Sequence, residues 1–95
     1  MSLLGHEELQ RKLKELEGWS GDTACISKSY TFEAFMDGIA FVNRVAEIAE
    51  EKNHHPDIDI RWTTVKTMLS THSEGGVTHK DIELTKAIDE AAASR

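Results

Sequence analysis

Hydrophobic residues along this chain recur at two spacings, and each spacing predicts a different kind of element. Steps of three and four positions place apolar side chains on one face of a helix, whereas strict alternation places them on one face of a strand. The helical spacing occurs in three stretches: His6–Glu17, about Glu33–Lys52, and a last helix after Thr78 that carries Ile82, Thr85, Ile88 and Ala92. Gly18 ends the first helix, and Pro56 must lie beyond the second because proline blocks helical continuation. Thr78 and Asp81 resemble a capping box at the start of the third.

Alternation predicts the strands and, with them, the fold class. It occurs in three stretches: Thr23–Phe32, Ile58–Trp62 and Val65–His72. Trp19-Ser20 is expected to pair back on the first of these as a short arm, Thr63-Thr64 to turn between the other two, and Gly75-Gly76 to allow a sharp loop. The order α-β-β-α-β-β-α predicts an α+β fold, a four-stranded antiparallel sheet with three helices packed on one face. Residues 1–95 are expected to form a single domain.

The long middle helix carries more apolar surface than one narrow stripe. One stripe consists of Phe35, Ile39, Val42, Ala46 and Ala49. A second stripe, about 100° around the helix, consists of Phe41, Val45 and Ile48. Either the sheet covers this whole arc, or part of it docks on another subunit.

Composition narrows the possible functions. Asp and Glu outnumber Lys and Arg 17 to 11, the formal net charge is −6, and no basic run occurs, which argues against direct nucleic-acid binding. No stretch approaches the about 20 apolar residues of a membrane span, and the first residues lack the pattern of a signal peptide. The single cysteine, Cys25, fits a reducing compartment, so we expect a cytoplasmic protein.

Three histidines are the strongest candidates for chemistry. His54 and His55 follow the long helix directly, and His72 lies at the end of the last strand, one hairpin later. Because a hairpin returns the chain to its start, the three imidazoles are expected to converge. Glu50 and Asp81 could orient them, since a carboxylate that accepts a hydrogen bond from one ring nitrogen fixes the tautomer.

Several functions remain open for such a cluster. A zinc site is possible, although adjacent histidines diverge and no CxxC, HxH or HExxH spacing occurs. Nucleophilic catalysis lacks a motif around Ser70 and Ser73, and a binding module without an active site is a further alternative. The remaining alternative is metal-free general acid–base chemistry on a small heterocycle, with Trp62 either a core or rim aromatic or a stacking surface. His6 and His79 are expected to be exposed and outside the site.

These residues resemble a known family. The runs Glu50–Asp57 (EEKNHHPD) and Ser70–Thr78 (STHSEGGVT), followed by Asp81, are similar to those of the pterin-4a-carbinolamine dehydratases. The resemblance spans nearly the whole chain. It implies an α+β fold and dehydration of 4a-hydroxytetrahydropterin to quinonoid dihydropterin, with no metal and no redox cofactor. It also implies a homodimer or homotetramer and a pathway that recycles the cofactor of an aromatic-amino-acid hydroxylase.

The resemblance also assigns roles by position. It places the catalytic histidines on His54, His55 and His72. The expected substrate-binding or orienting residues are Glu50, Asn53, Pro56, Trp62 and Asp81. Asn53 stands where some members have Asp, and Trp62 replaces a usual Tyr. Some animal members also act as the dimerisation cofactor of a homeodomain transcription factor, and some relatives act in Rubisco assembly, so a non-catalytic binding module on this fold is the alternative function.

Overall fold

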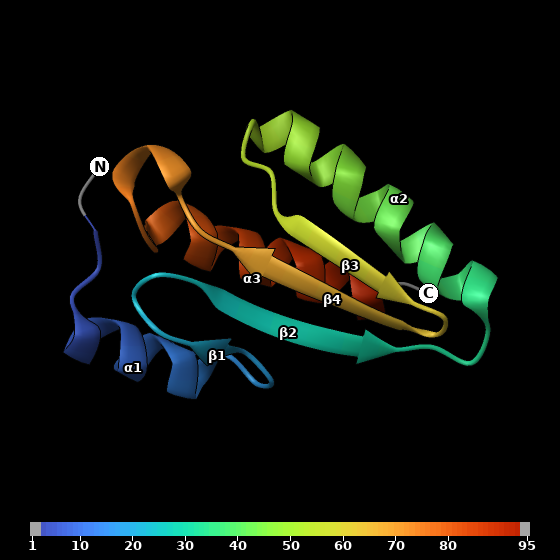
Figure 1. The fold of residues 1–95 in the computed structure, drawn as a ribbon, viewed down its shortest axis with the longest axis horizontal. Helices are drawn as coiled ribbons and strands as arrows, with labels where there is room; N and C mark the ends of the chain where they lie inside the picture. Colours follow the sequence, from blue (N-terminus) through green and yellow to red (C-terminus); the bar gives the residue numbers. More distant parts are fainter. Residues whose placement is uncertain (1–2, 94–95) are drawn as a thin grey trace.

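A computed structural model describes residues 3–93 (Figure 1). The ends of the predicted domain, residues 1–2 and 94–95, lie outside the described residues. The elements run in the predicted order: α1 (His6–Glu15), β1 (Ser20–Gly21), β2 (Ile26–Thr31), α2 (Phe35–Lys52), β3 (Asp57–Arg61), β4 (Thr64–Leu69), the short 3₁₀ helix η1 (His72–Glu74) and α3 (His79–Ala93). Within residues 3–93, no helix is both long and apolar enough to span a bilayer.

The four strands form one antiparallel sheet in the order β1-β2-β4-β3. The register pairs Ile26 with Leu69 and Tyr30 with Val65, so these four buried side chains share one face. On that face the ring of Phe41 of α2 packs against that of Tyr30 at a tilt of 50°, with ring centroids 4.8 Å apart. The helices and this face enclose one apolar core, which confirms the predicted α+β fold.

Two predicted strand boundaries are wrong, and each has a local cause. The second strand begins at Ile26 rather than Thr23, because the Asp22 carboxylate accepts hydrogen bonds from the backbone amides of Ala24 and Cys25 and holds a turn there. The fourth strand ends at Leu69 and does not reach His72, because the chain closes a tight loop after Ser70.

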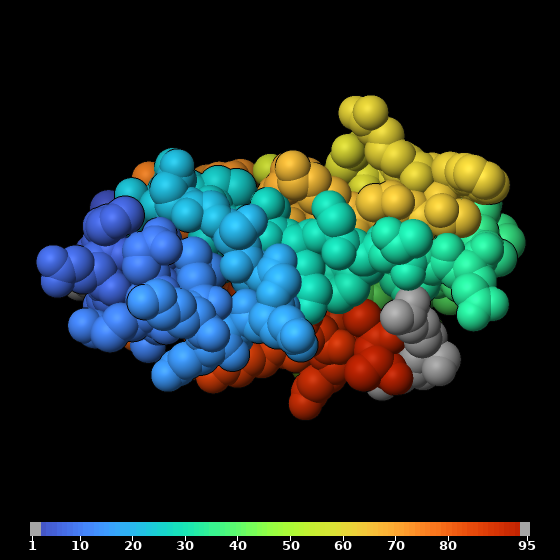
Figure 2. Space-filling model, turned by 90° about the horizontal axis from the view of Figure 1, so that it is seen from below, coloured from blue at the N-terminus to red at the C-terminus, as the bar shows by residue number. Residues whose placement is uncertain are grey.

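The turn between β3 and β4 also differs from the prediction. Trp62 was expected on the strand, but it occupies the turn with φ 53°, and Arg61 pairs with Thr64 across it. Its side chain is 79% exposed. The yellow hairpin segment projects from the surface in Figure 2. Trp62 therefore does not belong to the half-buried strand face.

The sheet covers only part of the apolar arc of α2. Gly38, Phe41, Val45 and Ala49 are buried against the sheet and α3. Of the stripe that begins at Phe35, only Ala49 is buried; Phe35 itself is 44% exposed, and its neighbour Met36 is 67% exposed. An apolar strip of α2 is thus left uncovered within the described chain.

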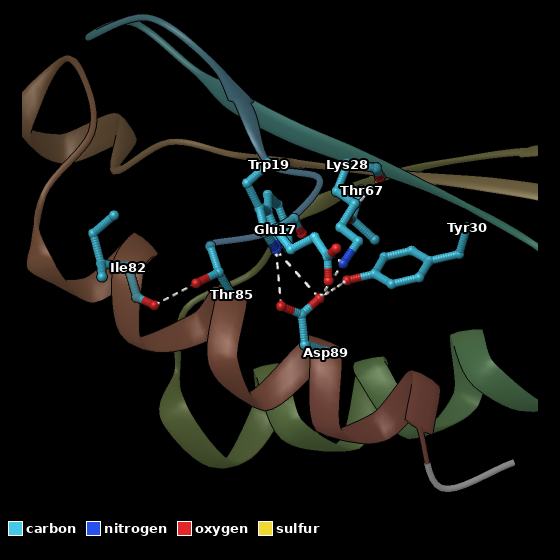
Figure 3. Close-up of polar contacts among 8 residues, drawn as sticks. All are labelled: Glu17, Trp19, Lys28, Tyr30, Thr67, Ile82, Thr85 and Asp89. Carbon is cyan, nitrogen blue, oxygen red and sulfur yellow. Dashed lines mark hydrogen bonds and ion pairs between the residues drawn. The ribbon is translucent and has the colours of Figure 1, made fainter. Parts of the chain in front are cut away.

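Asp89 of α3 ties the helix to the sheet (Figure 3). Its carboxylate accepts hydrogen bonds from Trp19 Nε1 at 3.2 Å and from the Tyr30 hydroxyl, and it pairs with Lys28 Nζ at 2.9 Å. Trp19 and Tyr30 are both buried, so the cluster satisfies two polar groups that cannot easily reach water. Burial raises the pKa of Tyr30, and the hydrogen bond and charge of Asp89 raise it further.

This raised pKa predicts alkaline destabilisation. Above pH about 10 the unfolded chain loses the Tyr30 proton while the folded chain keeps it, so the free energy of unfolding falls by about 1.4 kcal/mol per pH unit. Urea denaturation at several pH values should show that the Tyr30→Phe variant lacks this fall in the free energy of unfolding. Any pH dependence that comes from lysine titration should be the same in both proteins. Tyr30 is the only tyrosine, so tyrosinate absorbance reports it alone. Ionisation near pH 10 in the folded protein would contradict the prediction.

Candidate active site

The end of α2 directs two histidines out of the helix. Asn53 adopts the left-handed conformation (φ 52°, ψ 43°), its amide donates to the Glu50 carbonyl, and the His54 amide donates to the Ala49 carbonyl. These bonds form a Schellman motif, which ends the helix and turns the chain sharply. His54 and His55 therefore emerge from the helix end, and Pro56 leads the chain into β3.

A tight loop presents the third histidine. Thr71 pairs with Gly76 in an isolated bridge, and His72–Glu74 form one 3₁₀ turn between them. Gly75 takes φ 80°, and a side chain at Gly76 would collide with the backbone of Thr23. The loop lies toward the same end of the molecule as the end of α2 and the start of α3 (Figure 1).

A buried carboxylate connects the loop, α3 and His54. Asp81 is fully buried, and its Oδ2 accepts hydrogen bonds from the Thr78 amide at 2.9 Å and the Thr71 hydroxyl at 2.8 Å. The Thr78 hydroxyl lies 2.8 Å from that of Thr71 and accepts from the Lys80 amide, which completes the predicted capping box. The other oxygen, Oδ1, lies 2.6 Å from His54 Nε2.

The three imidazoles differ in their partners. A carboxylate only accepts hydrogen bonds, so His54 carries a hydrogen on Nε2, and no residue in the range 3–93 bonds its Nδ1, which is left for a bound molecule. His55 Nε2 lies 2.5 Å from Oε2 of Glu50 at an exposed position. His55 therefore also carries a hydrogen on Nε2 and presents Nδ1 to a bound molecule. Within residues 3–93, His72 makes no side-chain hydrogen bond, so both of its nitrogens are open to a ligand.

The three histidines line one open cleft of about 370 Å³. This volume lies within the range of small-molecule sites, roughly 300–1,000 Å³. The lining consists of Asn53, His54, His55, Ser70, Thr71, His72, Ser73 and Lys80. The expected convergence of the histidines is therefore present in the structure.

The other predicted site residues lie around the cleft or away from it. Glu50 and Asp81 do not line it but hold two of the histidines that do. Pro56 sets the chain direction without lining the cleft. Trp62 lies at the far end of β3, which at about 3.3 Å per residue places it beyond reach of the histidines of the same chain. His6 and His79 are exposed, as predicted.

Within the described residues, no group of three or more His, Cys, Asp or Glu side chains has an arrangement that could hold a metal ion. Two site residues were not singled out from the sequence, Thr71 and Lys80. Thr71 is buried, and its hydroxyl donates a hydrogen bond to Asp81. The capping-box pattern of Thr78 and Asp81 was the one signal in the sequence that the Asp81 carboxylate would need such donors.

Comparison with known proteins identifies the family. A family model described as pterin 4 alpha carbinolamine dehydratase matches residues 2–91. A protein of Mycobacterium sp. (strain KMS) that carries this family's name is 51% identical over 90 residues, which is 95% of this chain and 96% of its own. The chain belongs to the pterin-4a-carbinolamine dehydratase family. A family relative from Nocardia farcinica is 50% identical over 95% of both chains.

Two solved structures agree with the fold. A Brucella melitensis protein described as a transcriptional coactivator/pterin dehydratase is 32% identical and superposes with a TM-score of 0.89, covering 94% of this chain and 97% of its own. A pterin dehydratase-like protein described as a RuBisCO assembly factor in the alpha-carboxysome is 22% identical, with a TM-score of 0.67 over 81% of this chain and 89% of its own. The second likeness shows a shared fold.

The two carboxylates of the site are expected to differ sharply in their effect on stability. Asp81→Ala should lower the free energy of unfolding by about 2–4 kcal/mol, because it leaves buried donors on Thr71 and Thr78 unsatisfied and removes a helix cap. Glu50→Ala should change it by less than about 0.5 kcal/mol, since the Glu50 side chain is 79% exposed. Urea denaturation of both variants tests this contrast, and equal losses would contradict it.

Proposed function

We propose that this protein dehydrates 4a-hydroxytetrahydropterin to quinonoid dihydropterin and water by metal-free acid–base catalysis. The observation that carries the proposal is the single cleft lined by His54, His55 and His72. Membership of the dehydratase family supports the same reaction. The expected role is recycling of the cofactor of an aromatic-amino-acid hydroxylase.

The reaction requires two proton transfers. The substrate carries a hydroxyl on C4a and a hydrogen on the adjacent ring nitrogen, and loss of both as water forms a C=N bond. Hydroxide is a poor leaving group, so an acid must protonate it while a base takes the nitrogen proton. Imidazole can serve in either role near neutral pH, and each role contributes about 10²–10⁴-fold in rate.

The hydrogen-bond partners support a division of these roles. His54 or His55 acts in its imidazolium form as the acid: Nε2–H donates to the carboxylate that engages it, and Nδ1–H gives its proton to the leaving hydroxyl. His72 acts on the ring nitrogen, since its side chain has no partner among residues 3–93 and can turn to the substrate. Glu50 and Asp81 are positioning residues, and Asn53 at the cleft wall orients the pterin.

Histidine substitutions test the assignment. His55→Ala and His72→Ala should each lower kcat about 10²–10⁴-fold, because each removes a proton-transfer group, while circular dichroism stays unchanged. Stopped-flow kinetics with freshly generated 4a-hydroxytetrahydropterin measures the effect. His6→Ala and His79→Ala are matched controls of the same residue type, at exposed positions outside the cleft.

Wild-type rates in the cleft variants would refute the assignment of the histidines. Loss of activity on treatment with a chelator, restored by a divalent metal, would refute the metal-free mechanism. A folded wild-type protein that forms a stable complex with another protein but turns over no pterin would instead support the alternative, a non-catalytic binding module.

The uncovered surface of α2 supports a homodimer or homotetramer. Phe35 and Met36 are exposed on it, and among residues 3–93 β3 is an edge strand whose one partner is β4. Unpaired strand edges and exposed apolar strips are both surfaces on which a second copy of a chain docks. We propose that copies of this chain associate through these surfaces.

Analytical ultracentrifugation tests the association. The wild-type protein should sediment as a dimer or tetramer. Phe35→Glu combined with Ile39→Glu should shift it toward the monomer, since two carboxylates would be desolvated in the interface. Lys14→Glu on α1 is a charge-changing control away from α2 and β3 and should keep the wild-type state. A monomeric wild-type protein would contradict the proposal.

A further inference from the structure

A second depression adjoins the histidine cleft. It has a volume of about 330 Å³ and is lined by Lys52, His54, Lys80 and Glu83. His54 and Lys80 line both hollows, so the two meet at these side chains. A ligand whose ring lies in the cleft could therefore extend a substituent into the second depression.

The side chains that line this depression carry a net positive charge, which is unusual in so acidic a chain. Two ammonium groups face one carboxylate there, although the protein has a formal net charge of −6. Within residues 3–93, the lysine and arginine ion pairs are Lys28 with Asp89 and Arg61 with Asp59. Lys52 and Lys80 make neither an ion pair nor a side-chain hydrogen bond in that range.

The position of Lys80 at the start of α3 is a further reason to expect an anion beside it. Lys80 is the second residue of α3, where the helix dipole disfavours a positive charge. Asp81, the acidic residue of this first turn, is buried and already bonded to His54, Thr71 and Thr78. An anion beside Lys80 would be stabilised by the ammonium group and by the positive end of the helix together.

We propose that Lys52 and Lys80 determine side-chain specificity by binding an anionic group, such as a phosphate monoester, on the side chain of the pterin. The inference rests on the proposed function, because it requires the pterin ring to lie in the histidine cleft. A lysine ammonium is a suitable point-charge partner for phosphate. Each exposed charge pair changes affinity by about 1.5- to 5-fold. The two lysines and the helix end together should therefore give roughly a tenfold preference for a phosphorylated over a neutral pterin side chain.

Equilibrium binding tests the preference without catalysis. Two non-reacting 7,8-dihydropterins with the same hydroxylated side chain are titrated, one neutral and one carrying a terminal phosphate monoester. The wild-type protein should bind the phosphorylated compound roughly tenfold more tightly at low ionic strength, and added salt should reduce the ratio. In the variant Lys52→Gln/Lys80→Gln the ratio should fall to near one.

Lys86→Gln is the matched control. Lys86 is exposed on the same helix and lines neither hollow, so its substitution should keep the wild-type ratio. Inorganic phosphate, titrated alone, should bind much more weakly than the phosphorylated pterin. Equal Kd values for the two pterins, an unchanged ratio in the double variant, or equally tight inorganic phosphate would each overturn the inference.

A dehydration assay separates this inference from the proposed function. The 4a-carbinolamines of both tetrahydropterins are used as substrates. Turnover of both with equal kcat/KM would overturn the specificity inference and leave the proposed function intact. Absence of turnover together with preferential binding of the phosphorylated pterin would overturn the dehydratase proposal and support the binding site. Absence of any pterin binding would overturn the inference as well.

Discussion

The site depends on one buried carboxylate that serves two purposes at once. One oxygen of Asp81 closes the first turn of α3 and accepts from Thr71 of the loop, and the other holds the ring of His54. A fully buried carboxylate is costly unless each oxygen has donors, and here the backbone, a hydroxyl and an imidazole provide them. The same bonds that fix the start of a helix thereby fix the orientation of a histidine from a distant part of the sequence.

This dependence explains how much could be predicted from the sequence. The element order and the meeting of the three histidines followed from local spacing, because a hairpin brings the residues on either side of it together. The capping pair was visible in Thr78 and Asp81, and the hydrogen bonds confirm it. The sequence indicated that carboxylates would orient the imidazoles, but it did not indicate that Asp81 would pair with His54 in particular.

The parts that escaped prediction depend on tertiary geometry. Trp62 fits a strand by its alternation, but the register of β3 on β4 places the turn one residue earlier. Alternation up to His72 likewise suggested a longer strand, whereas the bridge of Thr71 to Gly76 diverts the chain. The position of Lys80 at two adjoining hollows could not be predicted, since nothing in the sequence around a single lysine indicates which hollow its side chain lines.

The left-handed conformation of Asn53 limits which residues can end α2. At φ 52° a side chain with a branched or bulky Cβ is strained, whereas Asn, Asp and Gly tolerate the position. Exchange of the Asn53 amide for a carboxylate would leave the chain path unchanged and add a negative charge at the wall of the cleft. The charge of the histidine cleft can therefore be altered at this corner by replacing one nitrogen with one oxygen, independently of how the backbone folds.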